Sequence, residues 1–151
     1  MEKIQEFDKK FQTIYTQMIE IAFEYVNRNV EEINVVYVFG SIEPSGYFYN
    51  LAYKINGNII RPHKVNTVSK QQYDINRERT FALLKMGNSY LREIDLLFKE
   101  YDREVPTVLS LEYFPKTGKF DSKFEYGLKY TGHKTRTAQD VYEDWYKKLN
   151  D

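Results

Sequence analysis

Two stretches in which apolar and polar residues alternate, each beside a turn signal, constrain the fold of this chain most strongly. Large apolar residues recur at every second position over 47–55, and Asn56-Gly57 follows. Both turn residues tolerate the positive φ angles of a tight hairpin. The same alternation runs over 107–114, is broken by Pro115 to Gly118, and resumes over 120–130. Because hairpins join neighbouring antiparallel strands, we expect an antiparallel sheet.

Two further strands extend this pattern. Residues 33–42 are rich in β-branched and aromatic side chains, which predicts a strand. After the turn at Asn56-Gly57, residues 59–61 are predicted to return as a short strand. Pro62 ends it, because proline has no N–H to donate to a sheet.

Apolar residues at steps of three and four predict a long amphipathic helix over 2–27. A second helical pattern covers 73–101, most clearly from Leu83, while the polar run 74–80 could form a separate short helix. Ser69 and Gln72 have the spacing of a capping box before it. Gly87 is expected to be a weak point or a site of close approach.

Thr137 to Asp140 resembles a capping box that starts a short C-terminal helix. The expected order is therefore helix, three strands, long helix, two strands and helix. This order predicts one α+β domain over 1–151, in which the two long helices cover the apolar face of the sheet.

Charge and cysteine content exclude several classes of protein. Lys+Arg and Asp+Glu both number 22, and this balance disfavours duplex binding, which uses a basic excess to displace counterions. The chain has no cysteine, which excludes disulfides and thiolate zinc sites and suits a reducing compartment. No apolar run has the length of a membrane helix, and Met1 to Glu6 has no apolar core for a signal peptide. We therefore expect a cytoplasmic protein with no membrane association.

No local motif indicates catalysis. Gly40-Ser41 follows a strand but precedes no helix start, so it is not a nucleophile elbow. His63 and His133 have no partners at metal-binding spacing, and no glycine-rich loop could cradle a phosphate. We therefore expect no catalytic residue, cofactor or metal. The alternative is a small enzyme whose site is assembled from distant residues, and its candidates are Glu93, Asp95, Asp121, Glu125 and His133.

Aromatic residues are abundant, with 14 tyrosines, 10 phenylalanines and one tryptophan. Alternation splits the aromatic residues of one strand between its two faces, so some tyrosines are expected on the surface. Tyrosine and tryptophan are enriched in protein interfaces, and a stacking platform for single-stranded nucleic acid is disfavoured because no basic groove accompanies them. The candidate partner-binding residues, each with a structural role as its alternative, are Tyr47, Tyr49, Asp121, Glu125 and Trp145.

Several short motifs resemble the YezG-like antitoxin and immunity family, formerly a domain of unknown function. They are Gly118-Lys-Phe120, Phe124-Glu-Tyr126 and the terminal helix that holds Trp145, in the same order of elements. The chain departs from the family where members carry a tryptophan before the first strand and another after Pro106.

The resemblance implies a non-enzymatic function. Members are similar to inhibitors that protect a producing cell from secreted bacterial toxins, often nucleases, by occluding or distorting the toxin's active site. It implies that the partner is a cognate protein toxin. From the charge balance we expect no direct binding of nucleic acid, and we expect a monomer or weak homodimer. A third hypothesis is a housekeeping interaction module that dimerises through an exposed tyrosine-rich sheet.

Overall fold

A computed structural model describes residues 2–151, and Met1 lies outside them. In chain order its elements are α1 (Glu2–Tyr25), β1 (Ile33–Glu43), β2 (Gly46–Ile55), β3 (Asn58–Ile60), the 3-10 helix η1 (Pro62–Thr67), α2 (Arg77–Glu100), β4 (Val108–Phe114), β5 (Lys119–Glu125) and α3 (Ala138–Leu149). The strands form one five-stranded sheet in the order β3-β2-β1-β4-β5, and every neighbouring pair is antiparallel. The predicted α+β class and antiparallel sheet are confirmed.

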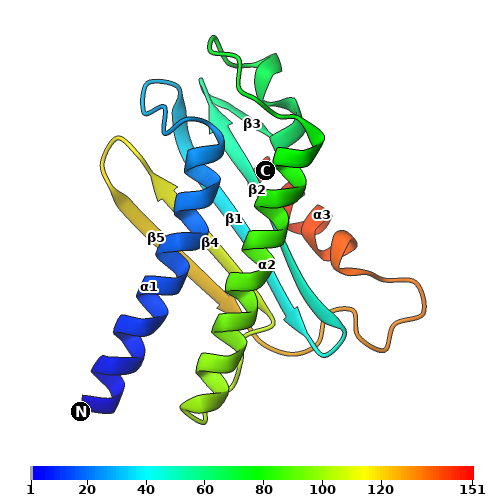
Figure 1. Ribbon diagram of the computed structural model, residues 1–151. Coiled ribbons are helices and arrows are strands. Elements are labelled where there is room, and N and C mark those ends of the chain that lie inside the picture. The colour runs from blue at the N-terminus through cyan, green and yellow to red at the C-terminus, as the bar shows by residue number, and fades with distance from the viewer. Residues whose placement is uncertain (1) are drawn as a thin grey trace.

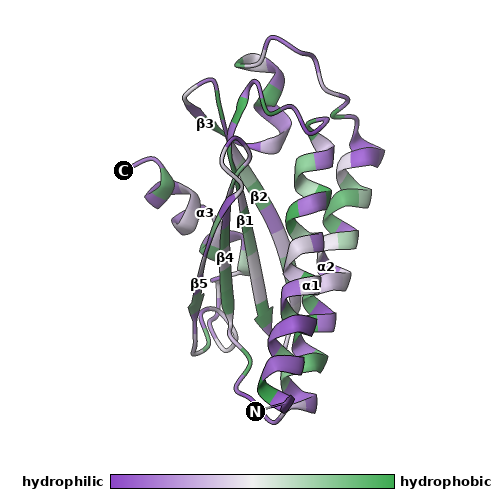
Figure 2. Cartoon of the chain, turned by 90° about the vertical axis from the view of Figure 1, so that its left-hand side faces the viewer, coloured by the Kyte–Doolittle hydropathy of each residue, from purple (hydrophilic) through white to green (hydrophobic). Residues whose placement is uncertain are grey.

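Helices cover both faces of the sheet. In Figure 1, α1 lies in front of β4 and β5, and α2 lies in front of β1 and β2. The turned view in Figure 2 shows α3 on the opposite side of the sheet from α1 and α2. The prediction that the two long helices cover one apolar face is confirmed. The position of α3 was not predicted, and it adds a smaller apolar layer around Phe39, Tyr142 and the half-buried Trp145.

Strand alternation divides the aromatic side chains between these two layers. Tyr49 and Tyr53 of β2 point under the long helices, and their hydroxyls donate to the carbonyls of Met18 and Ala22 in α1. Tyr142 of α3 lies on the other side and donates to the carbonyl of Leu51 over 2.7 Å. Buried tyrosine hydroxyls need such partners. Much of the aromatic content is therefore core with satisfied hydroxyls.

The predicted close approach at Gly87 is confirmed. A Cβ added at Gly87 would lie 2.1 Å from ring carbons of Tyr49, far inside van der Waals contact. Only glycine therefore allows the ring of Tyr49 to lie directly on α2 at this point. The contact fixes the distance between α2 and the sheet.

Two buried glutamates, one before β1 and one at its end, each hold an irregular segment. Glu32 accepts hydrogen bonds from the Tyr73 hydroxyl at 2.9 Å and from the backbone N–H groups of Lys70 and Gln71. Burial alone raises the pKa of Glu32, but these hydrogen bonds outweigh it and hold the pKa below its ordinary value. Segment 68–73 is thereby fixed to the start of β1.

Glu43 has the corresponding role at the other end of β1. Its carboxylate accepts from the backbone N–H groups of Lys129 at 2.7 Å and Thr131 at 2.9 Å, and from the Thr131 hydroxyl at 2.6 Å. Burial again raises the pKa, and the hydrogen bonds again hold it below the ordinary value. This contact fixes the segment that leads from β5 to α3.

Three sequence predictions are wrong in detail. The last strand ends at Glu125 rather than continuing to Tyr130, because the chain then turns to meet Glu43. Residues 74–76 are not helical, and the second helix begins at Arg77 with Asn76 as its N-cap. Ser69 and Gln72 form no capping box, since the Ser69 hydroxyl donates to the carbonyl of Gln71 in an irregular segment. The capping box of Thr137 and Asp140 is confirmed.

Candidate functional site

α3 covers only part of its side of the sheet, around Tyr37, Phe39 and Ala52. The open part is formed by outward side chains of β4 and β5, which we call the β4–β5 face: Ser110, Glu112, Lys119, Asp121, Lys123 and Glu125. A hollow of about 300 Å³ lies on it, lined by Ser110, Glu112, Asp121, Ser122 and Lys123. This is the side of the sheet away from the two long helices, so a partner could reach it without displacing them.

Hairpin register sets which charges meet on the β4–β5 face. Glu112 lies directly opposite Asp121, and Ser110 lies opposite Lys123. Like charges at opposite positions are unfavourable in a sheet. Lys119 lies 3.7 Å from the Asp121 carboxylate, whereas no Lys or Arg within residues 2–151 comes within 4.0 Å of Glu112. The face therefore offers two neighbouring carboxylates with incomplete internal compensation.

Trp145 forms the wall of the β4–β5 face on the side of α3. Its indole N–H donates to the Ser110 hydroxyl over 2.9 Å, and its ring lies 5.4 Å from the ring of Phe39. The side chain is half-buried. One side of the ring thus belongs to the small apolar layer, and the remainder borders the open face.

Other contacts hold α3 in this position. Arg61 forms a bidentate pair with Glu143 at 2.8 and 2.5 Å, and its guanidinium lies over the ring of Tyr146 at 4.1 Å. The hydrogen bonds from Arg61 lower the pKa of Glu143. Since Arg61 follows β3, this pair ties α3 to the far edge of the sheet and helps to place Trp145 beside β4.

Three of the five predicted partner-binding residues meet here, and two do not. Asp121 and Glu125 are exposed on the β4–β5 face, and Trp145 borders it. Tyr47 and Tyr49 point to the opposite side, under α2. Tyr49 is only 2% exposed, so its prediction as a surface residue is wrong.

Tyr47 is half-buried, and its contact with α2 defines its role in the fold. Its hydroxyl donates to the Asp95 carboxylate over 2.7 Å, and this hydrogen bond raises the pKa of Tyr47. Lys99 lies 3.1 Å from the same carboxylate. Tyr47 therefore connects β2 to α2 and is remote from the β4–β5 face.

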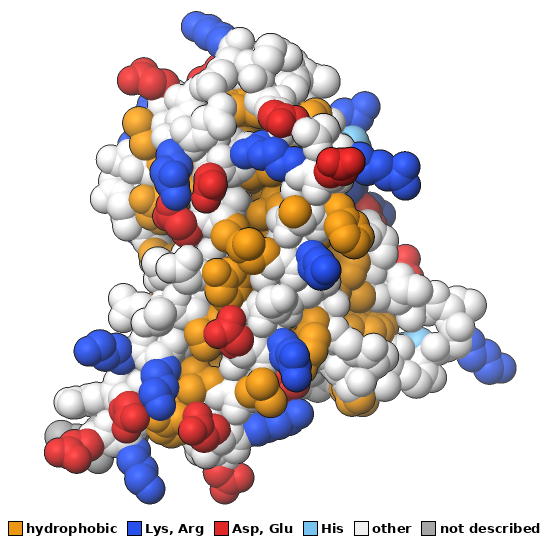
Figure 3. Space-filling view, viewed as in Figure 1, with side chains coloured by type: hydrophobic (Ala, Val, Ile, Leu, Met, Phe, Trp, Pro, Cys, Tyr) orange, Lys and Arg blue, Asp and Glu red, His pale blue; other side chains and the backbone are white. Residues whose placement is uncertain are grey.

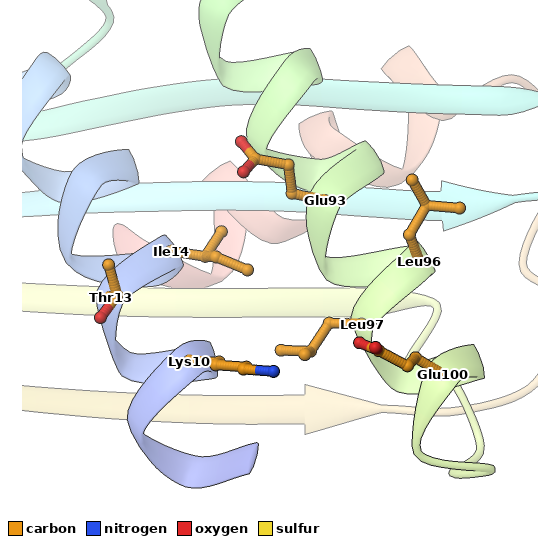
Figure 4. Close-up of a pocket in the computed structure, with 7 residues that line it drawn as sticks. All are labelled: Lys10, Thr13, Ile14, Glu93, Leu96, Leu97 and Glu100. Atoms are coloured by element: carbon orange, nitrogen blue, oxygen red, sulfur yellow. The ribbon is translucent and has the colours of Figure 1, made fainter. Parts of the chain in front are cut away.

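The candidates for a carboxylate enzyme do not converge. Asp121 and Glu125 lie on the α3 side of the sheet. Asp95 belongs to α2 on the other side, and its side chain faces Tyr47 of β2. Glu93 is exposed on α2, where it lines the groove between α1 and α2 (Figure 4), and His133 is exposed in the segment before α3. From Glu2 to Asp151, no group of three or more His, Cys, Asp and Glu side chains could hold a metal ion.

Sequence reasoning missed two features of the surface. One is Glu112, whose place opposite Asp121 could have been found by pairing residues outward from the turn at Pro115 to Gly118. The other is a groove of about 500 Å³ between α1 and α2, lined by Lys10, Thr13, Ile14, Glu93, Leu96, Leu97 and Glu100. Apolar side chains gather along this seam in Figure 3, and Leu96 is 54% exposed. A helical pattern does not reveal which apolar positions a second helix leaves uncovered.

No family model matches the chain, and no curated protein matches it in sequence. In the part of the chain that the structure describes, no helix has the length and apolarity needed to span a membrane.

Proposed function

We propose that this chain is an immunity protein or antitoxin that binds a cognate secreted bacterial toxin and neutralises it by occluding or distorting its active site. The β4–β5 face is its binding surface, with Trp145 at the border. The toxin is a protein, with a nuclease as the favoured kind. Compartment and partner follow from this proposal: the chain acts in the cytoplasm of the producing cell.

One observation carries the proposal. Asp121, Glu125 and Trp145, selected as contact residues from sequence, come from two elements that are distant in the chain and lie around one open face. Two sequence motifs of the family resemblance, Gly118-Lys-Phe120 and Phe124-Glu-Tyr126, fall on β5 and its ends. Of these motif residues, Lys119 and Glu125 have side chains on the proposed surface, whereas Phe120 and Phe124 pack against α1.

The chemistry of the β4–β5 face suits a basic partner surface. Interface energy is concentrated in a few anchors, with tryptophan among the most frequent. Glu112 and Asp121 are opposite one another, so a lysine or arginine from a partner would relieve their repulsion. Nuclease active sites bind polyanions and present basic groups, so opposed carboxylates would favour association. A chain with zero net charge can supply this complementarity locally.

The enzyme hypothesis lacks comparable support. Its candidate residues lie on opposite sides of the sheet, where they cannot act on one substrate. The hypothesis of a tyrosine-rich dimerisation face is weakened because Tyr49 and Tyr53 are core residues. Neither alternative gathers its residues at one surface.

Co-expression tests the proposal. The chain is produced together with the toxic domain encoded beside its own gene, and growth and complex formation by pull-down are measured. We expect rescue of growth and a stable complex. Asp121→Lys with Glu125→Lys should abolish rescue, while the charge-matched control Asp8→Lys with Glu31→Lys, at two exposed positions away from the face, should retain it. Growth arrest despite ample folded chain, with no complex, would refute the proposal.

A further inference from the structure

The two edge strands of the sheet differ in whether side chains block their free backbone groups. On one side, β3 pairs only with Tyr53 to Ile55, which leaves the first half of β2 as an edge. Side chains block that edge, since the Asn88 side-chain oxygen accepts from the Tyr49 N–H at 2.8 Å and Tyr142 donates to the Leu51 carbonyl. Such blocking prevents another strand from pairing there.

The other edge, β5, has no such protection along its length. β5 is the last strand of the sheet. Between Phe120 and Phe124, no side chain or neighbouring segment within residues 2–151 hydrogen-bonds to its backbone from the outer side. In Figure 1 this edge is uncovered, because α1 lies in front of the strand rather than beside it. The outward N–H and C=O groups of β5 are therefore free to pair with another strand.

The sequence of β5 is complementary to itself when it is read in the opposite direction. Its outward charges on the α3 side alternate as Lys119, Asp121, Lys123 and Glu125. If two copies pair antiparallel with Ser122 opposite Ser122, Lys119 faces Glu125 and Asp121 faces Lys123, each pair occurring twice. On the α1 side, Phe120 then faces Phe124. Opposite charges and aromatic pairs at facing positions both stabilise antiparallel strands.

We propose that the β5 edge binds β5 of a second copy of this chain in this register, joining two sheets into one continuous sheet about a two-fold axis at Ser122. The interface is isologous, as in most homodimers. A zero net charge places no long-range repulsion between the copies. The internal ion pairs of Asp121 and Glu125 are exposed, so they are weak and free to exchange for pairs across the dimer.

The charge order also specifies the register. A shift of two residues in one direction places Lys119 opposite Lys123 and Asp121 opposite itself. A shift of two in the other direction places Asp121 opposite Glu125 and Lys123 opposite itself. A shift of one residue turns the charged side chains toward the aromatic face. Only pairing centred on Ser122 keeps all seven residues of β5 paired with favourable neighbours.

The two-fold axis is perpendicular to the sheet, so both β4–β5 faces lie on the same side of the dimer. Both α1 helices lie on the other side of the joined sheet. The β4–β5 face is therefore not covered in the dimer, although Asp121 and Glu125 then pair with Lys123 and Lys119 of the second copy, and Glu112 keeps no such partner. Self-association is measured on the purified chain alone, so its outcome is independent of the proposed function.

Sedimentation velocity from micromolar to millimolar concentration tests the dimer with charge variants. Lys123→Glu places two carboxylates opposite one another at both symmetry-related positions, and we expect dimerisation to weaken about tenfold or more. Asp121→Lys with Lys123→Asp restores complementarity, so it should regain the wild-type dissociation constant. Lys85→Glu, an exposed change on α2, is the matched control and should have no effect.

A cysteine variant tests the register separately, since the chain has no cysteine of its own. Ser122→Cys should form a disulfide-linked dimer on mild oxidation, while Ser89→Cys, an exposed serine on α2, should remain monomeric. A wild-type chain that is monomeric throughout overturns the proposal. So does a dimer that Lys123→Glu leaves unchanged, because its contact must then lie on another surface.

Discussion

Trp145 in α3 donates its indole N–H to the hydroxyl of Ser110 in β4, across 2.9 Å. The bond joins the terminal helix to the strand that carries one side of the β4–β5 face. It therefore couples the stability of α3 to the geometry of the proposed binding surface.

Removal of this hydrogen bond should cost about 1 kcal/mol in the free energy of unfolding. Ser110→Ala removes the acceptor, and Trp145→Phe removes the donor while keeping an aromatic ring against Phe39. Urea denaturation of both single variants and the double variant forms a thermodynamic cycle. We expect Ser110→Ala to cost little once Trp145 is phenylalanine. Fully additive losses would show that the bond contributes nothing.

Gly87→Ala should destabilise the protein, although alanine is the better helix former by about 1 kcal/mol. The added Cβ would lie 2.1 Å from the Tyr49 ring, and overpacking of this kind costs about 1–3 kcal/mol. Thermal unfolding measures the sign. Ser89→Ala, at an exposed position of α2 two residues after Gly87, is the control and should be neutral or stabilising. A stabilised Gly87→Ala variant would contradict the close packing of α2 on β2.

Acid should destabilise the fold through Glu32 and Glu43. Both pKa values lie below the ordinary value of 4.5 in the folded state. The unfolded chain then binds more protons, so the contribution is complete above pH 4.5 and is lost as pH falls through the folded pKa values. The free energy of unfolding should therefore decrease steeply as the pH is lowered below 4.5.

A conservative variant isolates this effect. Glu43→Gln should lower stability at neutral pH by about 2 kcal/mol, because the amide cannot accept all the hydrogen bonds of the carboxylate. The acid dependence should flatten at the same time. Glu31→Gln, at an exposed residue beside Glu32, should change neither quantity. Equal pH profiles for the wild type and Glu43→Gln would remove Glu43 from this explanation.

Arg61→Lys should weaken the attachment of α3 by about 1 kcal/mol. Lysine cannot reproduce the bidentate contact with Glu143 or the planar stacking on Tyr146. Lys148 is exposed on the same helix. Lys148→Arg is the matched control and should leave the attachment of α3 unchanged. Hydrogen exchange measures the opening of α3 directly. Unchanged exchange in Arg61→Lys would indicate that other contacts hold the helix.

Local signals in the sequence predicted most of the secondary structure. Asn56-Gly57 and the alternation around it define the β2–β3 hairpin, and Thr137 with Asp140 caps α3 as predicted. Errors arose where tertiary contacts override local pattern. Apolar alternation continues to Tyr130, but residues 129–131 leave the sheet because their backbone N–H groups donate to the Glu43 carboxylate.

The candidate site was only partly predictable, for a related reason. Alternation places Asp121 and Glu125 on the face of β5 away from the long helices, but it does not reveal how much of that face α3 covers. A surface position for Tyr49 is wrong because its side chain lies on the face of β2 that α1 and α2 cover, against Gly87 and the carbonyl of Met18. The contact between Trp145 and Ser110 joins residues distant in sequence, and no local pattern encodes such a pair.

Inhibition of the purified toxin domain by the purified chain is the most direct measurement of the proposed role. We predict that toxin activity falls to background at one equivalent of chain. Asp121→Lys with Glu125→Lys should leave the toxin active at that ratio, while Asp8→Lys with Glu31→Lys should inhibit as fully as the wild type. A toxin that remains fully active in a large excess of folded chain would contradict the proposal.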